Sequence, residues 1–311
     1  MKTILALLLV LVVLLACSRP EAPTPAAAAP PAPAPADHAQ QVDAWKQNRD
    51  KRLRAEDGWL TLVGLHWLRE GDNTFGSAKS NGIVMTAKAP ASMGALTLRD
   101  GRVTLKPARS AGLTIDGKPV TAPVELRPDT DEKGPTSVKS GSLLFYAIER
   151  AGRHGIRVKD PESEARTGFK GLEYYPIDTK WRFEARFEPY TPVKQIPITD
   201  ITGTTSDNPS PGALVFDVDG RTYRLDPILE GEDSLFIIFK DDTAADATYP
   251  AGRYLYSKMP GADGKVVVDF NKAYNPPCAF TDFATCPLPP KQNDLPLRIE
   301  AGEKKYAGVL H

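Results

Sequence analysis

"GALVFDVDGRTYRLDPI", residues 212–228, decides the fold class of this sequence. Two runs of alternating apolar and polar residues flank Asp219-Gly220, a dipeptide that favours a two-residue hairpin turn. The same pattern surrounds Asp100-Gly101 in "GALTLRDGRVTLKP", residues 94–107, and further Asp-Gly pairs stand at 116–117 and 263–264. Hairpin turns therefore occur in both halves of the chain, which predicts antiparallel sheets.

The rest of the body extends this reading. The chain contains 29 prolines and 24 glycines, and short strand-like segments dominate it. The convincing exception is residues 37–58, which predict one helix with a thin apolar stripe, capped by Asp37 and ended by Gly58. We therefore predict a mainly β fold, with an N-terminal β-sandwich at 59–165 and a C-terminal sandwich or small barrel at 166–311.

The first residues predict export. Lys2 precedes an unbroken apolar run at 4–16, which is shorter than the roughly 20 residues that a spanning helix needs and has the length of a signal-peptide core. The run ends in Ala16 and Cys17, which resembles the bacterial lipobox. We expect residues 1–16 to be a signal peptide and Cys17 to carry the lipid that anchors the protein in the membrane.

A Pro/Ala-rich segment at 17–36 predicts an extended tether between this anchor and the body. Ser18, rather than Asp, follows the lipid-bearing cysteine, which favours the outer membrane and a body facing the periplasm. Acidic and basic residues balance at 39 each, so the composition offers no strong field for nucleic acid. The sequence leaves the oligomeric state open.

Two resemblances add to this reading. The segments within residues 59–165 resemble a forkhead-associated-type β-sandwich in their order of turns and strands. Phosphothreonine readers of that type need an Arg where this chain has Ser77, so only the shape carries over. "GWLTLVGLHWLREGDNTFGS" (58–77), "RVKDPESEARTGFKGLEYYP" (157–176) and "DFNKAYNPPCAFTDFATCPLPPKQN" (269–293) resemble the bacterial and archaeal family called domain of unknown function 1684. That resemblance implies no reaction.

Common catalytic and cofactor motifs are missing from the sequence. It has no G-x-S-x-G elbow, no H-E-x-x-H, no P-loop and no G-x-G-x-x-G, and its four histidines are scattered. We therefore predict no metal and no cofactor.

Cys278 and Cys286 form an even pair once Cys17 carries lipid. In an oxidising compartment such a pair should form a disulfide, which is our first interpretation. Closing a loop of about nine residues would stabilise the fold by roughly 2–3 kcal/mol in the chain-entropy model. A metal-binding or reactive-thiol role is the second interpretation, and simple packing of buried cysteines is the third.

Polar residues near this pair and in two other segments make up the candidate site. The leading hypothesis is an envelope lipoprotein that binds a small ligand or envelope component in a polar cleft between the two β-domains. The candidate ligand-binding residues are Arg157, Asp160, Arg253, Asp269, Asn271, Tyr274 and Asn275. For Asn271 and Asn275 turn capping is the alternative, and for Arg253 it is an ion pair with Asp241 or Asp269. The alternative functions are an envelope hydrolase that uses carboxylates or Cys278, and an assembly factor without a pocket.

Overall fold

The computed structural model of the protein describes residues 35–308. The predicted signal peptide, the lipid-bearing Cys17 and nearly all of the predicted tether lie outside the described residues. The described chain begins with helix α1 (His38–Arg54), which confirms the predicted N-terminal helix but ends it before Gly58. Asp37 stands at the N-cap without a side-chain capping bond, because its carboxylate instead accepts a hydrogen bond from Gln41.

The next part of the chain forms two sheets. One is six-stranded and consists, in spatial order, of β1 (Leu62–Trp67), β11 (Arg153–Lys159), β10 (Leu143–Arg150), β9 (Val138–Ser140), β6 (Thr114–Ile115) and β7 (Lys118–Pro119). The other is five-stranded and consists of β3 (Ile83–Val84), β2 (Gly71–Gly76), β4 (Gly94–Arg99), β5 (Arg102–Pro107) and β8 (Val124–Leu126).

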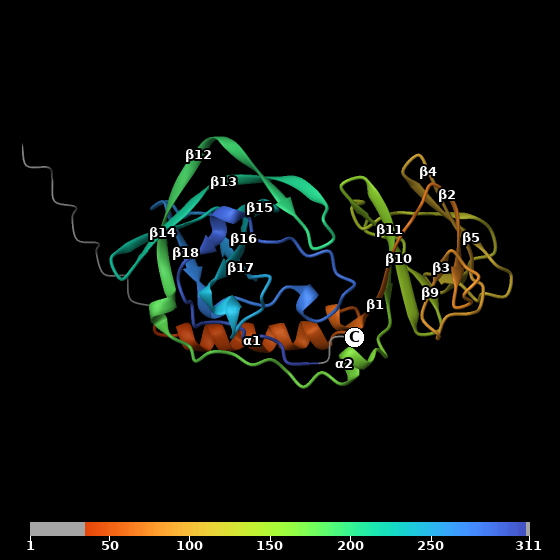
Figure 1. The fold of residues 1–311 in the computed structure, drawn as a ribbon, viewed down its shortest axis with the longest axis horizontal. Helices are drawn as coiled ribbons and strands as arrows, with labels where there is room; N and C mark the ends of the chain where they lie inside the picture. Colours follow the sequence, from red (N-terminus) through yellow and green to blue (C-terminus); the bar gives the residue numbers. More distant parts are fainter. Residues whose placement is uncertain (1–34, 309–311) are drawn as a thin grey trace, which may run out of the picture. The chain divides into compact units, whose positions relative to one another are not determined.

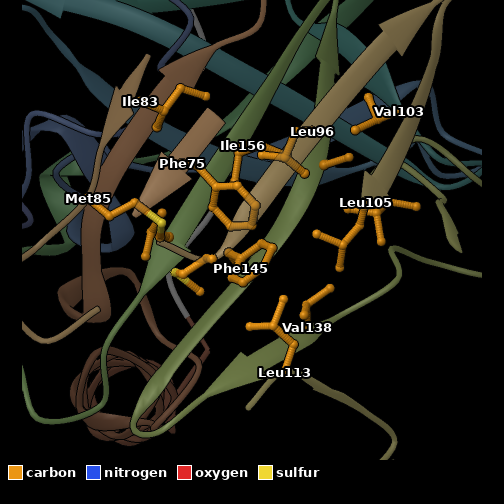
Figure 2. Close-up of a cluster of buried hydrophobic side chains, with 14 of the residues drawn as sticks. Phe75, Ile83, Met85, Leu96, Val103, Leu105, Leu113, Val138, Phe145 and Ile156 are labelled. Atoms are coloured by element: carbon orange, nitrogen blue, oxygen red, sulfur yellow. The ribbon is translucent and has the colours of Figure 1, made fainter. Parts of the chain in front are cut away.

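Side chains from both sheets form one core (Figure 2), which makes this part a β-sandwich. Phe75 of β2 and Phe145 of β10 are fully buried, and their ring centroids lie 5.6 Å apart in an edge-to-face arrangement. Leu96 and Leu105 enter the same core from the paired strands β4 and β5. The resemblance to forkhead-associated domains stays a prediction.

The C-terminal part contains two further sheets. One has the order β14 (Arg221–Leu225), β13 (Thr205–Val218), β12 (Arg182–Thr199) and β18 (Lys265–Asp269). The other has the order β15 (Ile228–Glu230), β16 (Ser234–Asp241) and β17 (Arg253–Lys258), with β19 (Asp294–Leu295) parallel to β16. Figure 1 shows the long β12–β13 ribbon curving over β16 and β17. Phe216, Phe239 and Phe270 join the two sheets in one core. The mainly β, antiparallel fold class is therefore confirmed.

Short helical turns connect these strands. They are η1 (Trp59–Thr61), α2 (Glu164–Thr167), η2 (Thr179–Trp181), η3 (Asp242–Ala245), η4 (Phe270–Lys272), η5 (Pro277–Ala279) and η6 (Lys291–Asn293). No helix within residues 35–308 is long and apolar enough to cross a membrane. The described residues belong to one compact unit, and the predicted domain boundary at 165/166 stays a prediction.

The Asp-Gly pairs behave as the sequence predicts at three of four places. Asp100-Gly101, Asp116-Gly117 and Asp219-Gly220 all have positive φ at both residues and close the β4–β5, β6–β7 and β13–β14 hairpins. The pair at 263–264 makes a turn instead between β17 and β18, which belong to different sheets. The hairpin prediction at 263–264 is therefore wrong, because an Asp-Gly turn can also connect strands that belong to two different sheets.

Candidate functional site: an arginine-lined cleft

A cleft of about 550 Å³ opens among α1, the end of β10, strands β15 to β17 and the loop that carries the two cysteines. This volume lies within the range of small-molecule sites. Three arginines and three tyrosines contribute to its wall, and they are Arg49, Arg52, Arg150, Tyr254, Tyr256 and Tyr274. We call it the arginine cleft.

Two guanidinium groups converge on one hydroxyl in the wall of the arginine cleft. Arg150 Nε donates to Thr285 Oγ1 at 3.2 Å, and the Nη2 of Arg157 donates to the same oxygen at 3.1 Å. The two arginines come from neighbouring strands, β10 and β11, whereas Thr285 comes from the cysteine loop. Arg150 also forms a two-pronged ion pair with Asp129, with N–O distances of 2.9 and 2.7 Å.

Arg157 differs from the other buried arginines within residues 35–308, which are Arg49 and Arg253. Arg49 pairs with Glu303 at 2.8 Å, and Arg253 pairs with Asp241 at 2.9 Å. Arg157 is 3% exposed, yet no carboxylate of the described residues lies within ion-pair distance of it. Its Nε has no hydrogen-bond partner there either. Burying a charge without a counter-charge is costly, so this guanidinium is the group of the site most in need of an anion.

The buried positive charge of Arg157 is partly compensated by an aromatic ring. Its guanidinium carbon lies 5.7 Å from the centroid of the Trp59 ring, which also lines the arginine cleft. A ring face attracts a cation but supplies no hydrogen-bond acceptor in its plane. The Nε of Arg157 therefore keeps an unpaired donor, and Arg157 reaches the cleft wall through its bond to Thr285.

The three tyrosines contribute aromatic rings and hydroxyl groups to the wall of the cleft. The rings of Tyr256 and Phe236 are stacked with centroids 4.9 Å apart, and Tyr274 lies nearly parallel to Tyr256 at 6.3 Å. The Tyr256 hydroxyl donates to Glu230 at 2.5 Å, and that of Tyr254 donates to the carbonyl of Pro287 at 2.7 Å. Burial raises the pKa of Tyr254, Tyr256 and Tyr274 above the ordinary tyrosine value, so these hydroxyls are neutral donors at physiological pH.

Helix α1 closes one side of the cleft with its basic end. The Arg49 guanidinium lies 4.7 Å from the Tyr274 ring centroid while its Nε donates to Glu303. Arg52 is exposed, lines the cleft and has no carboxylate within ion-pair distance among residues 35–308. Of the basic residues in this half of the helix, Arg49 and Arg52 therefore contribute to the cleft wall.

The two cysteines differ from our first interpretation. Cys278 and Cys286 are free thiols in the structure, and the predicted disulfide is not formed in it. The backbone N–H of Cys278 donates to the Cys286 sulfur at 3.0 Å, and both residues pack in an apolar cluster. The hydrogen bond with Cys286 lowers the pKa of Cys278, and burial raises the pKa of Cys286. Only Cys286 of the pair lines the arginine cleft.

Asp269 and Asn271 are placed in a buried network away from the cleft lining. Asp269 accepts from His38 of α1 at 2.9 Å and from the Asn271 side chain at 2.9 Å. Asn271 also exchanges two hydrogen bonds with the backbone of Asp178, each at 2.9 Å. Both side chains therefore hold α1, η4 and η2 together, which agrees with the turn-capping alternative.

Arg253 ties the C-terminal segment to β16. It is 1% exposed and donates to Asp241 at 2.9 Å, to the Ile299 carbonyl at 3.0 Å and to the Ala301 carbonyl. Asp241 in turn accepts from the Ile299 N–H at 2.9 Å. Of the two partners considered from the sequence, Asp241 is the one that Arg253 contacts.

Asn275 and Asp160 also form polar contacts with other segments of the protein rather than with the cleft. The Asn275 N–H donates to Glu303 at 2.7 Å, and its side chain donates to the Lys304 carbonyl at 2.8 Å. Asp160 pairs with Lys88 at 2.7 Å. Of the seven candidate residues, Tyr274 lines the arginine cleft and Arg157 contacts its wall, while the other five do not line it.

Sequence reasoning missed Arg150, Thr285, Tyr256 and Glu230. Arg150 stands at the end of a strand just before the turn residues Ala151 and Gly152, a position that alone suggests only solvent exposure. Thr285 directly precedes Cys286 in the segment 269–293, which is one of the segments that carry the family resemblance. This position next to the cysteine is the one sequence feature that could have indicated Thr285. No group of three metal-ligating side chains gathers in the part of the chain that the structure describes.

Comparisons with known proteins bear on the C-terminal part. Residues 167–304 match a family model described as "Protein of unknown function (DUF1684)", which confirms the resemblance inferred from the sequence. The comparison with curated proteins gave no match. A similar solved structure is the solution NMR structure of an uncharacterized protein from Haloarcula marismortui, 32% identical, which covers 45% of this chain and 78% of that one with a TM-score of 0.37.

Proposed function

We propose a ligand-binding role for this chain, which belongs through residues 167–304 to the family described as protein of unknown function DUF1684. The ligand is a small molecule or envelope component with an anionic group, and the arginine cleft holds it. This proposal is the finer form of the polar cleft predicted from the sequence.

The observation that carries the proposal is the unpaired state of Arg157. A buried guanidinium without a carboxylate raises the free energy of the empty protein, and a bound phosphate or carboxylate would offset that cost. Arg157 and Arg150 already point to one atom, Thr285 Oγ1, so an anion that replaces or joins this hydroxyl would meet donors from two arginines. Charge-assisted pairs of this kind are the strongest hydrogen bonds in proteins.

Arg52 supports the same assignment. It supplies positive charge at the cleft, while Glu230 is the one carboxylate of the cleft wall and already accepts from the Tyr256 hydroxyl. The cleft therefore favours an anion at the arginines and disfavours a second anion beside Glu230, because like charges repel.

The proposed location is the bacterial envelope. Cys17 would carry the lipid anchor, and the segment before residue 37 would hold the body away from the membrane surface, facing the periplasm. The support for this part is the apolar run at 4–16 followed by Ala16 and Cys17. An envelope ligand such as a phosphorylated or carboxylated surface component would then be within reach.

Isothermal titration of the full chain with inorganic phosphate and with acetate tests the binding role. Arg157→Met should weaken anion binding about 10- to 100-fold, since a hydrogen bond to a charged group contributes roughly 1.5–3 kcal/mol. The same variant should be at least as stable as the parent without ligand, because it removes an unpaired buried charge.

Arg153→Met is the matched control. Arg153 lies on the same strand β11, stacks on Trp67 at 4.1 Å and donates to the hydroxyl of Thr204 at 3.2 Å, but it is exposed and does not line the cleft. This variant should bind anions like the parent. An Arg157→Met variant that is strongly destabilised but binds anions unchanged would assign Arg157 to the frame and overturn the proposal.

A further inference from the structure

The exposed aromatic residues of the protein gather in the arginine cleft. Within residues 35–308, Tyr256 at 45% and Trp59 at 37% are the only aromatic side chains among the large exposed hydrophobic residues, and both line the cleft. Exposed rings cost free energy in water unless a partner covers them. Their gathering in one concave site indicates a ligand with a flat, partly apolar surface.

Hydrogen-bonding groups accompany these rings. The Glu230 carboxylate accepts from the Tyr256 hydroxyl and is exposed, so it has further lone pairs for donors of a ligand. The Asn208 side chain lines the cleft as well. A carboxylate and an amide beside exposed rings fit a ring that bears several hydroxyl groups, since each hydroxyl is both a donor and an acceptor.

A second hollow of about 210 Å³ adjoins the arginine cleft. The two share Arg150, Asn208, Ile228, Thr285 and Pro287 in their linings. Beyond this shared part the second hollow is lined by Ala151, Ile198, Asp200, Thr204 and Ser206, a mixture of apolar and polar residues. Arg150 and Thr285 thus lie where the two hollows meet, with exposed rings in the arginine cleft and the Thr204 and Ser206 hydroxyls in the second hollow.

We propose that the ligand of the arginine cleft is an anionic saccharide, whose sugar ring lies against Tyr256 and Trp59 while its phosphate or carboxylate meets Arg157, Arg150 and Thr285. This inference rests on the proposed function and names its ligand class. The continuation past Arg150 into the second hollow favours a saccharide with more than one unit over a mononucleotide, because that hollow offers the Thr204 and Ser206 hydroxyls but no exposed ring.

Titration calorimetry on the full chain separates the two parts of the ligand. The probes are inorganic phosphate, glycerol 3-phosphate, glucose 6-phosphate, glucuronate and adenosine monophosphate. Glucose 6-phosphate should bind at least about tenfold more tightly than glycerol 3-phosphate, and glucuronate should bind more tightly than acetate. Equal affinities for glucose 6-phosphate and glycerol 3-phosphate would overturn the saccharide assignment and leave the anion-binding role standing.

Two variants of one residue make the test sharper. Tyr256→Ala should reduce the gain of glucose 6-phosphate over glycerol 3-phosphate to less than about threefold. Tyr256→Phe keeps the ring and should retain most of the gain. If adenosine monophosphate binds more tightly than glucose 6-phosphate, the saccharide assignment is wrong and the ligand carries a nucleobase against the rings. Failure of every anion to bind would overturn the proposed function as well.

Discussion

The variant Arg253→Met tests whether Arg253 stabilises the fold, in contrast to Arg157, which we assign to ligand binding. Arg253 and Asp241 both have side chains that are 1% exposed, and they pair at 2.9 Å. The substitution keeps much of the side-chain volume but removes the charge and the donors to the Ile299 and Ala301 carbonyls. Asp241 then stays buried without its counter-charge.

The expected cost follows from this geometry. Removing one partner of a buried ion pair typically destabilises a protein by about 3–5 kcal/mol. Asp241 keeps the Ile299 N–H at 2.9 Å and the Thr243 hydroxyl at 2.7 Å, which places the expectation near the lower end of that range. For a unit of this size such a loss lowers the melting temperature by roughly 6–20 °C. Arg253→Met combined with Asp241→Asn should recover part of the loss, because no unpaired charge is then buried.

Differential scanning calorimetry and urea unfolding followed by tryptophan fluorescence measure the effect. Arg298→Met is the matched control, since Arg298 also pairs with two carboxylates, Asp246 at 3.0 Å and Glu300 at 2.8 Å, but it does so at the surface. Its melting temperature should change little. The reasoning fails if Arg253→Met melts within about 2 °C of the parent, or if it folds normally but no longer binds phosphate.

Two further predictions concern the cysteines. Mild oxidation of the purified protein should join Cys278 and Cys286, because the two free thiols are hydrogen-bonded to each other. Intact-mass analysis should then show the loss of two hydrogens, and urea unfolding should show a gain in stability of about 2–3 kcal/mol. Free thiols that persist after oxidation would contradict the expectation. Cys17→Ser should abolish lipid attachment and move the protein from the membrane fraction to the soluble fraction. The control Cys278→Ser should leave the protein in the membrane fraction. A Cys17→Ser protein that stays in the membrane fraction would contradict the lipid-anchor proposal.

Local sequence signals predicted the fold class because β-hairpins depend on short-range chemistry. Asp100-Gly101 and Asp219-Gly220 adopt the positive φ angles that a two-residue hairpin turn needs, and the flanking alternation orients each strand toward a core. The pair at 263–264 shows the limit of this signal. The dipeptide specifies a turn but not which sheet receives the next strand, and that choice depends on packing between layers.

The site was less accessible to sequence reasoning because its contacts span long distances along the chain. Arg157 and Thr285 are separated by 128 positions, and Arg49 reaches Glu303 across 254. Which arginine meets a carboxylate and which does not is decided by this long-range packing. The sequence singled out Tyr274, which lines the cleft, and Arg157, which contacts its wall. It could not distinguish Arg157 from Arg253, which carries the same group but pairs with Asp241.

The residues of the proposed ligand site come from both sides of the first residue of the family match. Tyr256, Glu230 and Thr285 lie within the residues that match the family model, whereas Arg150 and Arg157 lie before its first residue. A segment limited to 167–304 would keep Tyr256 and the Thr285 hydroxyl but lack Trp59 and both guanidinium groups of the proposed anion site. Under the proposed function, affinity for the anionic group would therefore require the longer chain, because Arg150 and Arg157 lie outside the family-matched residues.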